Sequence, residues 1–479
     1  MAAARKQLTV SSGITGLDDI LRGGLPASNL YIMQGDPGAG KTTAALQFLR
    51  AGVEAGERCI YVSLSQSASE LEAITLSHGW TLDGIRIEEL AASEPVNGGA
   101  DQTIFQTAEL RLDETRKAIE QAIEEYKPQR LVYDSLLEIR LITGDTPRFR
   151  RELIGFKAFL AKRGIVALLL DTQTNGGDHN GEEIEGIAHG VIRLDKTLEE
   201  YGAVRRRIEV SKMRGVAFAD GYHDMAIREG EGVVVFPRIV PGAVKEIAKP
   251  QLIKSGVETL DEMFGGGQES GTITLVIGQS GTGKSTMSSL YATAALQRGE
   301  SVALFLFEER LETFFRRSEG LGMELRQFYK DGQLVIYDFS PNQISAGEFG
   351  QIVQQVVSRN KTRVVVIDSF TGYLNSLPHR EKAVLDIQSL LKHLARADVL
   401  TMLIVAQHGL LGQNVGLDVD VSFLGDTVLL LRMTEHEGRL RRNITVVKKR
   451  HGPHDLDVRE LFIASSGVSV VAYNPLPEP

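Results

Sequence analysis

The stretch Gly35-Asp-Pro-Gly-Ala-Gly-Lys-Thr42 decides the fold of this chain. It satisfies the pattern G-x-x-x-x-G-K-[S/T] and follows a short apolar run, Leu30 to Met33, while an amphipathic helical pattern starts at Lys41. Glycines let the backbone approach phosphate oxygens with its N–H groups turned inward, and the helix N-terminus adds partial positive charge. The stretch therefore predicts a phosphate-binding loop between a strand and a helix.

A second copy of the loop follows later in the chain, as Gly278-Gln-Ser-Gly-Thr-Gly-Lys-Ser285. An element ahead of each loop also recurs, as Ser12-Gly-Ile-Thr-Gly-Leu-Asp18 and Ser255-Gly-Val-Glu-Thr-Leu-Asp261. Both pairs are separated by the same 243 residues, 255 minus 12 and 278 minus 35. Repeats in one order and at one spacing predict a duplicated domain.

Three prolines, Pro237, Pro241 and Pro250, predict a linker between the two copies. We set the boundary at residue 247, which gives an N-terminal nucleotide-binding domain over 1–247 and a C-terminal domain over 248–479. Within each half, short apolar runs alternate with amphipathic helical patterns. This alternation is typical of the α/β class, with a mainly parallel, doubly wound sheet flanked by helices.

The composition is that of an ordinary globular protein, with 42% hydrophobic residues. A formal net charge of -9 gives no electrostatic reason to expect a nucleic-acid partner. The single cysteine, Cys59, excludes an intrachain disulfide and fits a reducing compartment. No apolar stretch reaches the length that spans a bilayer, so we expect no membrane contact and a cytoplasmic location.

The two loops supply the residues expected to hold ATP. Lys41 and Lys284 would reach its terminal phosphates, and Lys284 would also act in catalysis. The other predicted nucleotide-binding positions lie in the loops and the first helical turns: Gly35, Gly38, Gly40, Thr42, Thr43, Gly278, Gly281, Thr282, Gly283, Ser285 and Thr286.

A Mg²⁺ ion is expected in each half. The hydroxyls of Thr42 and Ser285 are its predicted direct ligands. Asp134 and Asp368 end apolar strands, where P-loop ATPases place the acidic residue that holds the metal through water. Without the loops upstream, a turn residue at a strand end would be the simpler interpretation of either aspartate.

The halves differ after the second strand. The C-terminal half has Glu308 and Glu309 there, and a carboxylate beside the terminal phosphate can serve as general base. A solvated pair of carboxylates is the alternative. The N-terminal half has Ser65 and Gln66, neither of which accepts a proton near neutral pH, although a glutamine can orient water. We expect the N-terminal site to bind ATP and hydrolyse it slowly.

The tandem loops, the element ahead of each, the Glu308-Glu309 strand end and a late Lys-x-Arg block in each half resemble the KaiC family of circadian-clock ATPases and autokinases. The resemblance runs from about residue 8 to about residue 465. It implies two RecA-like domains, a hexameric double ring and ATP at the interfaces between subunits.

The resemblance also implies a role for the Lys-x-Arg blocks, Lys212 with Arg214 and Lys448 with Arg450. In the family these side chains reach the nucleotide of the neighbouring subunit. A cation supplied in this way offsets charge that develops on the transferred phosphate. An exposed basic strand end is the alternative. The short basic run Arg205-Arg-Arg207 is interpreted as a solvated strand edge rather than as a nucleic-acid patch.

By the same resemblance, Ser422 occupies the position of a serine that the C-terminal ring phosphorylates. Phe423 replaces the adjacent phosphoacceptor threonine, so a two-site cycle at adjacent residues is not expected, and Thr427 is an alternative acceptor. A buried serine at a strand start is the competing interpretation of Ser422. The chain ends soon after Phe462, so we expect no long regulatory tail, and a KaiB-like protein is the partner that the resemblance suggests.

Two other functions compete with a clock or timer ATPase. A DNA-dependent ATPase of the RecA/RadA type would need basic pore loops, but residues 171–188 and 406–424 contain no lysine or arginine. A nucleotide-gated scaffold with negligible catalysis fits Ser65 and Gln66, whereas Glu308 and Glu309 argue against it.

Overall fold

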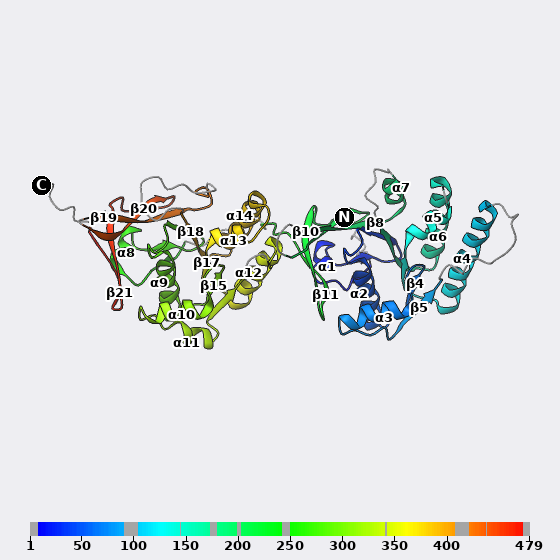
Figure 1. Cartoon of the computed structure of the whole chain (residues 1–479), viewed down its shortest axis with the longest axis horizontal. Helices are drawn as coiled ribbons and strands as arrows, with labels where there is room; N and C mark the ends of the chain where they lie inside the picture. The colour runs from blue at the N-terminus through cyan, green and yellow to red at the C-terminus, as the bar shows by residue number, and fades with distance from the viewer. Residues whose placement is uncertain are drawn as a thin grey trace, which may run out of the picture. The chain divides into compact units, whose positions relative to one another are not determined.

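The chain is described by a computed structural model over residues 8–90, 104–143, 145–172, 180–198, 203–241, 250–340, 343–407, 421–436 and 438–472. It forms two compact units, residues 1–200 with 204–238 and residues 201–203 with 239–479 (Figure 1). The main division follows Arg238, among the prolines that predicted a linker. The boundary at residue 247 lies outside the described residues and stays a prediction.

The N-terminal unit is built on a nine-stranded sheet in the order β11-β10-β9-β8-β3-β7-β6-β4-β5. The strands from β8 to β5 are parallel, and β9, β10 and β11 continue the sheet as antiparallel hairpins. β1 and β2 form a separate two-stranded sheet. The strands are β1 Thr9–Val10, β2 Leu25–Pro26, β3 Leu30–Gly35, β4 Cys59–Ser63, β5 Ile85–Glu89, β6 Arg130–Asp134, β7 Val166–Thr172, β8 Gly190–Thr197, β9 Arg205–Met213, β10 Tyr222–Arg228 and β11 Gly232–Phe236.

The C-terminal unit repeats this plan with the order β16-β15-β17-β18-β14-β19-β20-β21-β22. The strands from β16 to β19 are parallel, and the last three pairings are antiparallel. β12 and β13 again stand apart as a two-stranded sheet. The strands are β12 Leu252–Ile253, β13 Gln268–Glu269, β14 Ile273–Gly278, β15 Val302–Leu306, β16 Leu334–Asp338, β17 Val364–Asp368, β18 Leu400–Ala406, β19 Thr427–His436, β20 Arg439–Lys449, β21 Arg459–Ala464 and β22 Gly467–Ala472.

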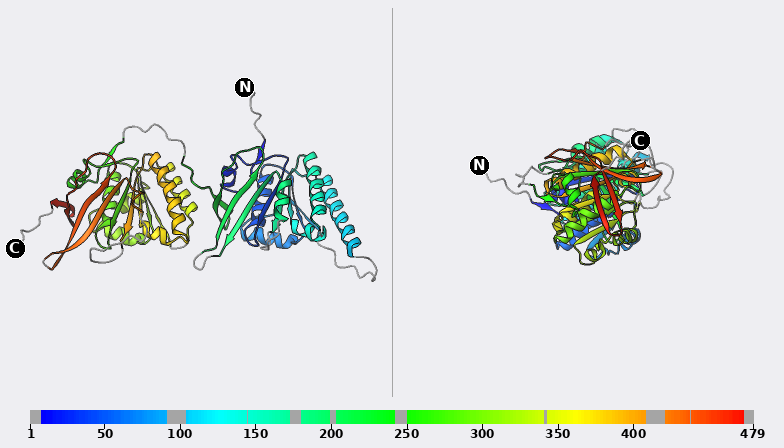
Figure 2. Two further views of the ribbon diagram at one scale, coloured as in Figure 1. Left: turned by 90° about the horizontal axis from the view of Figure 1, so that it is seen from above. Right: turned by 90° about the vertical axis from the view of Figure 1, so that its left-hand side faces the viewer.

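Helices cover both faces of each sheet, because successive residues of a buried strand point to opposite sides. In β7, Leu168 packs on the side of α2 and α3, while Leu169 packs on the side of α4, α5 and α6. Figure 2 shows the latter helices stacked on one side of the N-terminal sheet. The helices of this unit are α1 Leu17–Ile20, α2 Lys41–Glu54, α3 Ala68–Ser77, α4 Ile104–Tyr126, α5 Leu136–Thr143, α6 Thr146–Lys162 and α7 Asn180–Ile187.

The C-terminal sheet is covered in the same way. In β17, Val366 packs on the side of α9, α10 and α11, and Ile367 on the side of α12, α13 and α14. The two doubly wound α/β units with mainly parallel sheets confirm the predicted fold class. The helices of this unit are α8 Glu258–Met263, α9 Lys284–Gln297, α10 Leu311–Glu319, α11 Leu325–Lys330, α12 Ala346–Asn360, α13 Phe370–Asn375 and α14 Arg380–Arg396. None of the helices described in either unit has the length and apolarity needed to cross a membrane.

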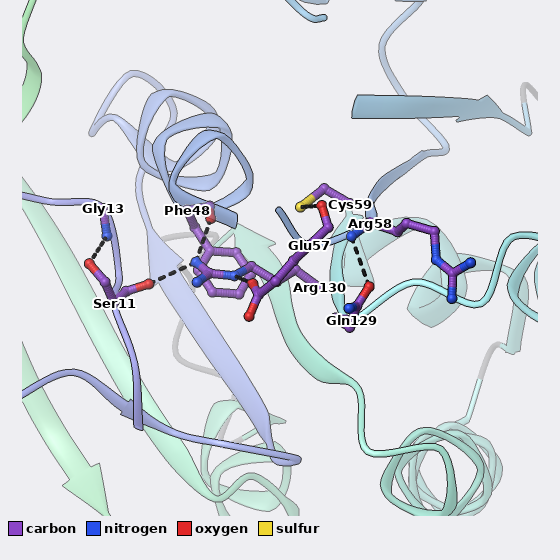
Figure 3. Close-up of polar contacts among 8 residues, drawn as sticks. All are labelled: Ser11, Gly13, Phe48, Glu57, Arg58, Cys59, Gln129 and Arg130. Carbon is purple, nitrogen blue, oxygen red and sulfur yellow. Dashed lines mark hydrogen bonds and ion pairs between the residues drawn. The ribbon is translucent and has the colours of Figure 1, made fainter. Parts of the chain in front are cut away.

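A buried arginine ties the helix of the first loop to the sheet (Figure 3). Arg130 opens β6 and donates hydrogen bonds to the carbonyl oxygens of Ser11 and Phe48, each at 2.8 Å. Its guanidinium pairs with the carboxylate of Glu57 and lies 4.8 Å from the ring centroid of Phe48. Because Phe48 belongs to α2, Arg130 fixes the helix that begins at the phosphate-binding loop.

Candidate nucleotide-binding sites

Both predicted phosphate-binding loops join a central parallel strand to a long helix, β3 to α2 and β14 to α9. The last loop residues, Gly40 and Gly283, have φ angles of 110° and 100°. A Cβ atom on Gly40 would lie 2.9 Å from Cδ1 of Ile227, and one on Gly283 would lie 2.5 Å from Cδ1 of Ile463. Backbone conformation therefore requires glycine at both positions, and an added side chain would also displace the end of an isoleucine.

The loop lysines fold back over their own loops. Lys41 Nζ donates to the carbonyl oxygens of Gly35 at 2.7 Å and Asp36 at 3.1 Å, and Lys284 Nζ donates to the carbonyl oxygen of Gln279 at 2.7 Å. Both ammonium groups therefore lie beside the loop backbone, where a bound phosphate would be cradled.

Burial lowers the pKa of both lysines, and nearby carboxylates oppose that shift. The charged ammonium is thereby kept available for a phosphate oxygen. The opposing carboxylates are Asp134, Asp171 and Asp36 around Lys41, and Asp368 and Glu308 around Lys284.

The predicted metal-binding aspartate of the N-terminal unit ends β6 and is buried. Burial raises the pKa of Asp134, and a hydrogen bond from Tyr61 Oη to Asp134 Oδ2, at 2.5 Å, opposes the shift. The hydroxyl of Thr42 is in turn hydrogen-bonded to Tyr61. The structure therefore brings Thr42 and Asp134 together through a tyrosine that the sequence analysis did not identify.

The C-terminal unit makes a more direct arrangement. Asp368 ends β17 and is buried, which raises its pKa, and a hydrogen bond with Ser285 opposes that shift. A hydroxyl and a carboxylate side by side are the oxygen donors that Mg²⁺ takes in P-loop sites, with the remaining positions left to water and phosphate. The residues present thus fit a magnesium ion in both units.

The two predicted catalytic glutamates differ in their restraints. Glu309 forms a two-pronged ion pair with Arg317 of α10, at 3.1 Å for Nε and 2.8 Å for Nη2. Glu308 is exposed and has no ion pair among the described residues. Its side chain runs past Gly372, where a Cβ atom would lie 2.9 Å from Glu308 Cγ. Glu308 is therefore not restrained by an ion pair among the described residues, whereas Glu309 is held by Arg317.

The matching place in the N-terminal unit holds no carboxylate. Ser65 is exposed, and Gln66 closes a turn in which its N–H donates to Ser63 Oγ at 3.0 Å and its carbonyl accepts from the same hydroxyl at 2.6 Å. The side-chain oxygen of Gln66 is buried without a partner among the described residues. A glutamine amide, with no proton acceptor beside it on this strand, therefore occupies the position of Glu309.

The first Lys-x-Arg block binds the end of α7. Lys212 Nζ donates to the carbonyl oxygen of Glu185, and Arg214 Nη2 donates to that of Gly186 at 2.8 Å. Carbonyl oxygens at a helix C-terminus carry partial negative charge and attract cations.

The second block binds the turn that carries the predicted phosphoacceptor. Lys448 Nζ donates to the carbonyl oxygens of Ser422 at 3.0 Å and Gly425 at 2.8 Å. Arg450 pairs with Asp426 at 3.2 Å. Both blocks therefore hold main-chain carbonyls just ahead of the first antiparallel hairpin.

Neither block lies at the loop of its own unit. The main-chain N–H of Arg214 donates to the carbonyl of His189, whose own N–H donates to the carbonyl of Leu30, the first residue of β3. The same ladder in the C-terminal unit ends at Ile273, the first residue of β14. The phosphate-binding loops follow the opposite ends of these strands.

Ser422 is exposed in a turn before β19, which contradicts the alternative of a buried serine at a strand start. Thr427 begins β19 and is only 3% exposed, so its hydroxyl is poorly placed to accept a phosphate from outside. Of the loops that the DNA-motor alternative needs, residues 173–179 and 408–420 lie outside the described residues.

Several residues near the loops were missed from the sequence. Arg206 approaches the carbonyl oxygen of Gly38 at 3.4 Å, and Arg442 Nε donates to that of Gly281 at 3.2 Å. The run of three arginines therefore does not lie on an edge strand, because β9 lies between β8 and β10, although Arg206 stays partly exposed beside the loop. The signal was present, since each arginine precedes the lysine of its block by six residues (212 minus 206 and 448 minus 442).

Comparison with known proteins gives the same picture of a repeated ATPase domain. The model of the KaiC ATPase family matches the chain twice, over residues 10–239 and 253–474. The chain is 27% identical to "Circadian clock protein KaiC3" of Synechocystis over 96% of its length and 91% of the relative. It is 30% identical to "Circadian clock protein KaiC2" of the same organism, covering 96% and 81%. It is 28% identical to "Circadian clock oscillator protein KaiC" of Thermosynechococcus vestitus, covering 95% and 88%. The chain therefore belongs to the KaiC family of ATPases.

Proposed function

We propose that this chain is a hexameric ATPase that binds ATP in both units, hydrolyses it mainly in the C-terminal unit and phosphorylates its own Ser422. The observation that carries the proposal is the unequal equipment of two otherwise matched sites. Lysine, hydroxyl and buried aspartate recur in both, whereas only the second site has Glu308 and Glu309. In the cell such a protein serves as a timer or signalling ATPase, and its relatives with clock names support that role.

In the C-terminal site, Lys284 binds the terminal phosphate oxygens, and Ser285 and Asp368 would hold a Mg²⁺ ion, whose positive charge would offset that of the phosphates. Glu308 takes a proton from water as the water oxygen bonds to the γ-phosphorus. The bond from that phosphorus to the bridging oxygen of ADP breaks at the same time. Glu309, fixed by Arg317, keeps the end of β15 in place.

Autophosphorylation uses the same chemistry with the Ser422 hydroxyl in place of water. The proton of that hydroxyl leaves to a carboxylate, and the γ-phosphoryl group is transferred to the serine oxygen. The contact that supports this step is the one between Lys448 and the Ser422 carbonyl. Because Lys448 is bonded to the exposed turn that contains Ser422, a Lys448 that reaches the nucleotide of a neighbouring subunit places Ser422 close to that nucleotide.

The N-terminal site holds ATP and turns it over slowly, because Ser65 and Gln66 supply no general base. Its nucleotide then serves mainly to hold subunits together through Lys212 and Arg214. Lys212 and Arg214 lie far from the loop of their own unit. In a hexameric double ring with nucleotide at each interface, they would instead contact the nucleotide that a neighbouring subunit binds. A KaiB-like protein is the proposed partner, and the cytoplasm the proposed location.

Phosphate release by the wild-type chain and by Glu308→Gln/Glu309→Gln tests the hydrolysis. Loss of most turnover supports the proposal. Equal release from both proteins contradicts it and favours a scaffold that only binds nucleotide. Single-stranded DNA added to the wild-type assay tests the motor alternative, which predicts a rise in turnover that we do not expect.

Incubation with ATP followed by phosphosite mapping tests the kinase activity, with Ser422→Ala as the matched variant. Phosphate on Ser422 supports it, and a C-terminal unit without phosphate leaves only the ATPase. Mass measurement with and without ATP and Mg²⁺ tests assembly, which nucleotide should drive because it links two chains. A monomer under both conditions contradicts the hexamer.

A further inference from the structure

The N-terminal site contains an ion pair that the C-terminal site lacks. Arg140 of α5 donates from Nη2 to both carboxylate oxygens of Asp171, at 3.1 and 3.2 Å. Asp171 lies near the carboxyl end of β7 and is 2% exposed, while the Arg140 side chain is 25% exposed. The pair thus has a buried anion and a cation that is partly exposed to solvent.

Asp171 stands beside the base of the phosphate-binding loop. It pairs in register with Gln34 on β3, one residue before the loop begins, and the Gln34 amide donates to it at 3.3 Å. Its charge also acts on the loop lysine, since Asp171 is among the carboxylates that raise the pKa of Lys41 against the lowering by burial. The carboxylate is therefore within electrostatic reach of the place where the terminal phosphate is bound.

The repeat shows that the fold does not need this pair. The equivalent positions, six residues after Asp368 and one before the end of β18, are Leu374 and Val405. Both are buried in the core of the C-terminal unit, at 6% and 4% exposure. Apolar residues that replace a buried ion pair are often neutral or stabilising. The fold therefore does not explain the charges at Arg140 and Asp171, and we look for their role in nucleotide binding.

We propose that Arg140 recognises the γ-phosphate of ATP in the N-terminal site, and that Asp171 holds it when that phosphate is absent. This inference rests on the proposed function, in which the N-terminal site binds ATP. A γ-phosphate near Asp171 meets a negative charge, which the guanidinium of Arg140 offsets, because a guanidinium forms two-pronged hydrogen bonds with phosphate oxygens as it does with carboxylate oxygens. ADP brings no such charge, so the pair distinguishes ATP from ADP in a site built to hold ATP.

The test measures binding of AMP-PNP and of ADP, each with Mg²⁺, to the full chain carrying Lys284→Ala, so that the N-terminal site dominates. Arg140→Leu should weaken AMP-PNP binding by about ten- to a hundredfold, the range for one charge-assisted hydrogen bond, and leave ADP within about twofold. Equal losses for the two nucleotides, or none for either, overturn the inference. A Lys284→Ala protein that binds neither nucleotide contradicts the proposed function itself.

The double variant Arg140→Leu/Asp171→Val removes the charges together and installs the residues of the other unit, so no buried carboxylate is left alone. It should fold, bind AMP-PNP more tightly than Arg140→Leu and favour AMP-PNP over ADP less than the wild-type site does. If it keeps the wild-type ratio of the two affinities, the inference is wrong. Arg163→Leu is the matched control, because this arginine pairs with Glu124 at the opposite end of β7 and should change neither affinity.

Discussion

The two nucleotide sites share their loops, lysines and aspartates, yet each has an arginine–carboxylate pair in a different place. In the N-terminal unit the pair is Arg140 with Asp171, between α5 and β7. In the C-terminal unit it is Arg317 with Glu309, between α10 and the residues after β15. The first pair lies where it can act on nucleotide binding, and the second where it can act on hydrolysis.

Neither member of either pair has a charged counterpart in the other unit. Glu309 and Arg317 correspond, 243 residues earlier, to Gln66 and Ile74. Arg140 and Asp171 correspond to the apolar residues described above. One partner alone would leave a poorly compensated charge, so both members are present or both are absent. The comparison teaches that the duplicated fold has been specialised at the carboxyl edge of its sheets, while the phosphate-binding machinery stayed the same.

The largest expected effect is on hydrolysis. Glu308→Gln should reduce phosphate release by about 10²- to 10⁴-fold, the usual contribution of a general base. Glu309→Gln should reduce it less, because Glu309 acts through the backbone that it fixes with Arg317. Steady-state phosphate release from the three proteins measures this order. A larger loss in the Glu309 variant would reverse the assignment of the two carboxylates.

The second effect is on folding of the N-terminal unit, whose Arg130 has the apolar counterpart Val364 (234 residues later). Arg130→Ala should lower the free energy of unfolding by about 3 kcal/mol, since it leaves Glu57 without its cation and removes a hydrogen bond from each of two main-chain carbonyls. Trp80, the only tryptophan, is buried in this unit, so its fluorescence in a denaturant series reports the change. The surface variant Arg163→Ala should lower the free energy of unfolding by less than about 1 kcal/mol. Equal losses in the two variants would show that Arg130 does not fix α2 to the sheet.

The third effect is a gain. Ser65→Glu, Gln66→Glu and Ile74→Arg together transfer the catalytic residues of the second site to the first. In a Lys284→Ala background, phosphate release should rise by about tenfold, a small part of what a well-placed general base supplies. Ser65→Glu with Gln66→Glu alone, with Ile74 unchanged, should give less, because no cation would then hold the second glutamate. No gain in either protein would mean that the slow site is limited by something other than the missing base.

The sequence predicted those parts of the sites that a local motif determines. A loop such as Gly278 to Ser285 sets its own backbone conformation and carries its lysine and hydroxyl with it, so its place in the fold follows from a few neighbouring residues. Asp134 and Asp368 were found because each ends an apolar strand. The alternation of strands and helices predicted the sheets for the same reason.

The parts that were missed depend on which strands become neighbours. Arg140 and Asp171 are 31 residues apart, and nothing in the local pattern brings them together. Arg206 reaches Gly38 across 168 residues, through a hairpin whose register the composition does not specify. Tyr61 looked like an ordinary buried strand residue, and only the pairing of β4 with β6 places its hydroxyl on Asp134.

The smallest effect concerns the metal-binding aspartate itself, and it separates stability from function. Burial raises the pKa of Asp368 in the folded, nucleotide-free protein, so the folded state binds its proton more tightly than the unfolded state. Stability from this group is therefore greatest in acid and is lost as the pH rises through the raised pKa. Asp368→Asn, which cannot ionise, should be more stable than the wild type near neutral pH by about 1 kcal/mol, and the difference should vanish in acid. Hydrogen exchange of C-terminal peptides at two pH values measures this in the absence of nucleotide.

The same variant should lose the protection from hydrogen exchange that nucleotide and Mg²⁺ give to the wild type. The buried charge of Asp368 therefore lowers the stability of the protein without nucleotide, and the same charge allows the site to bind its metal. A variant less stable than the wild type at neutral pH would mean that Ser285 and the surrounding cations more than offset the burial of the charge.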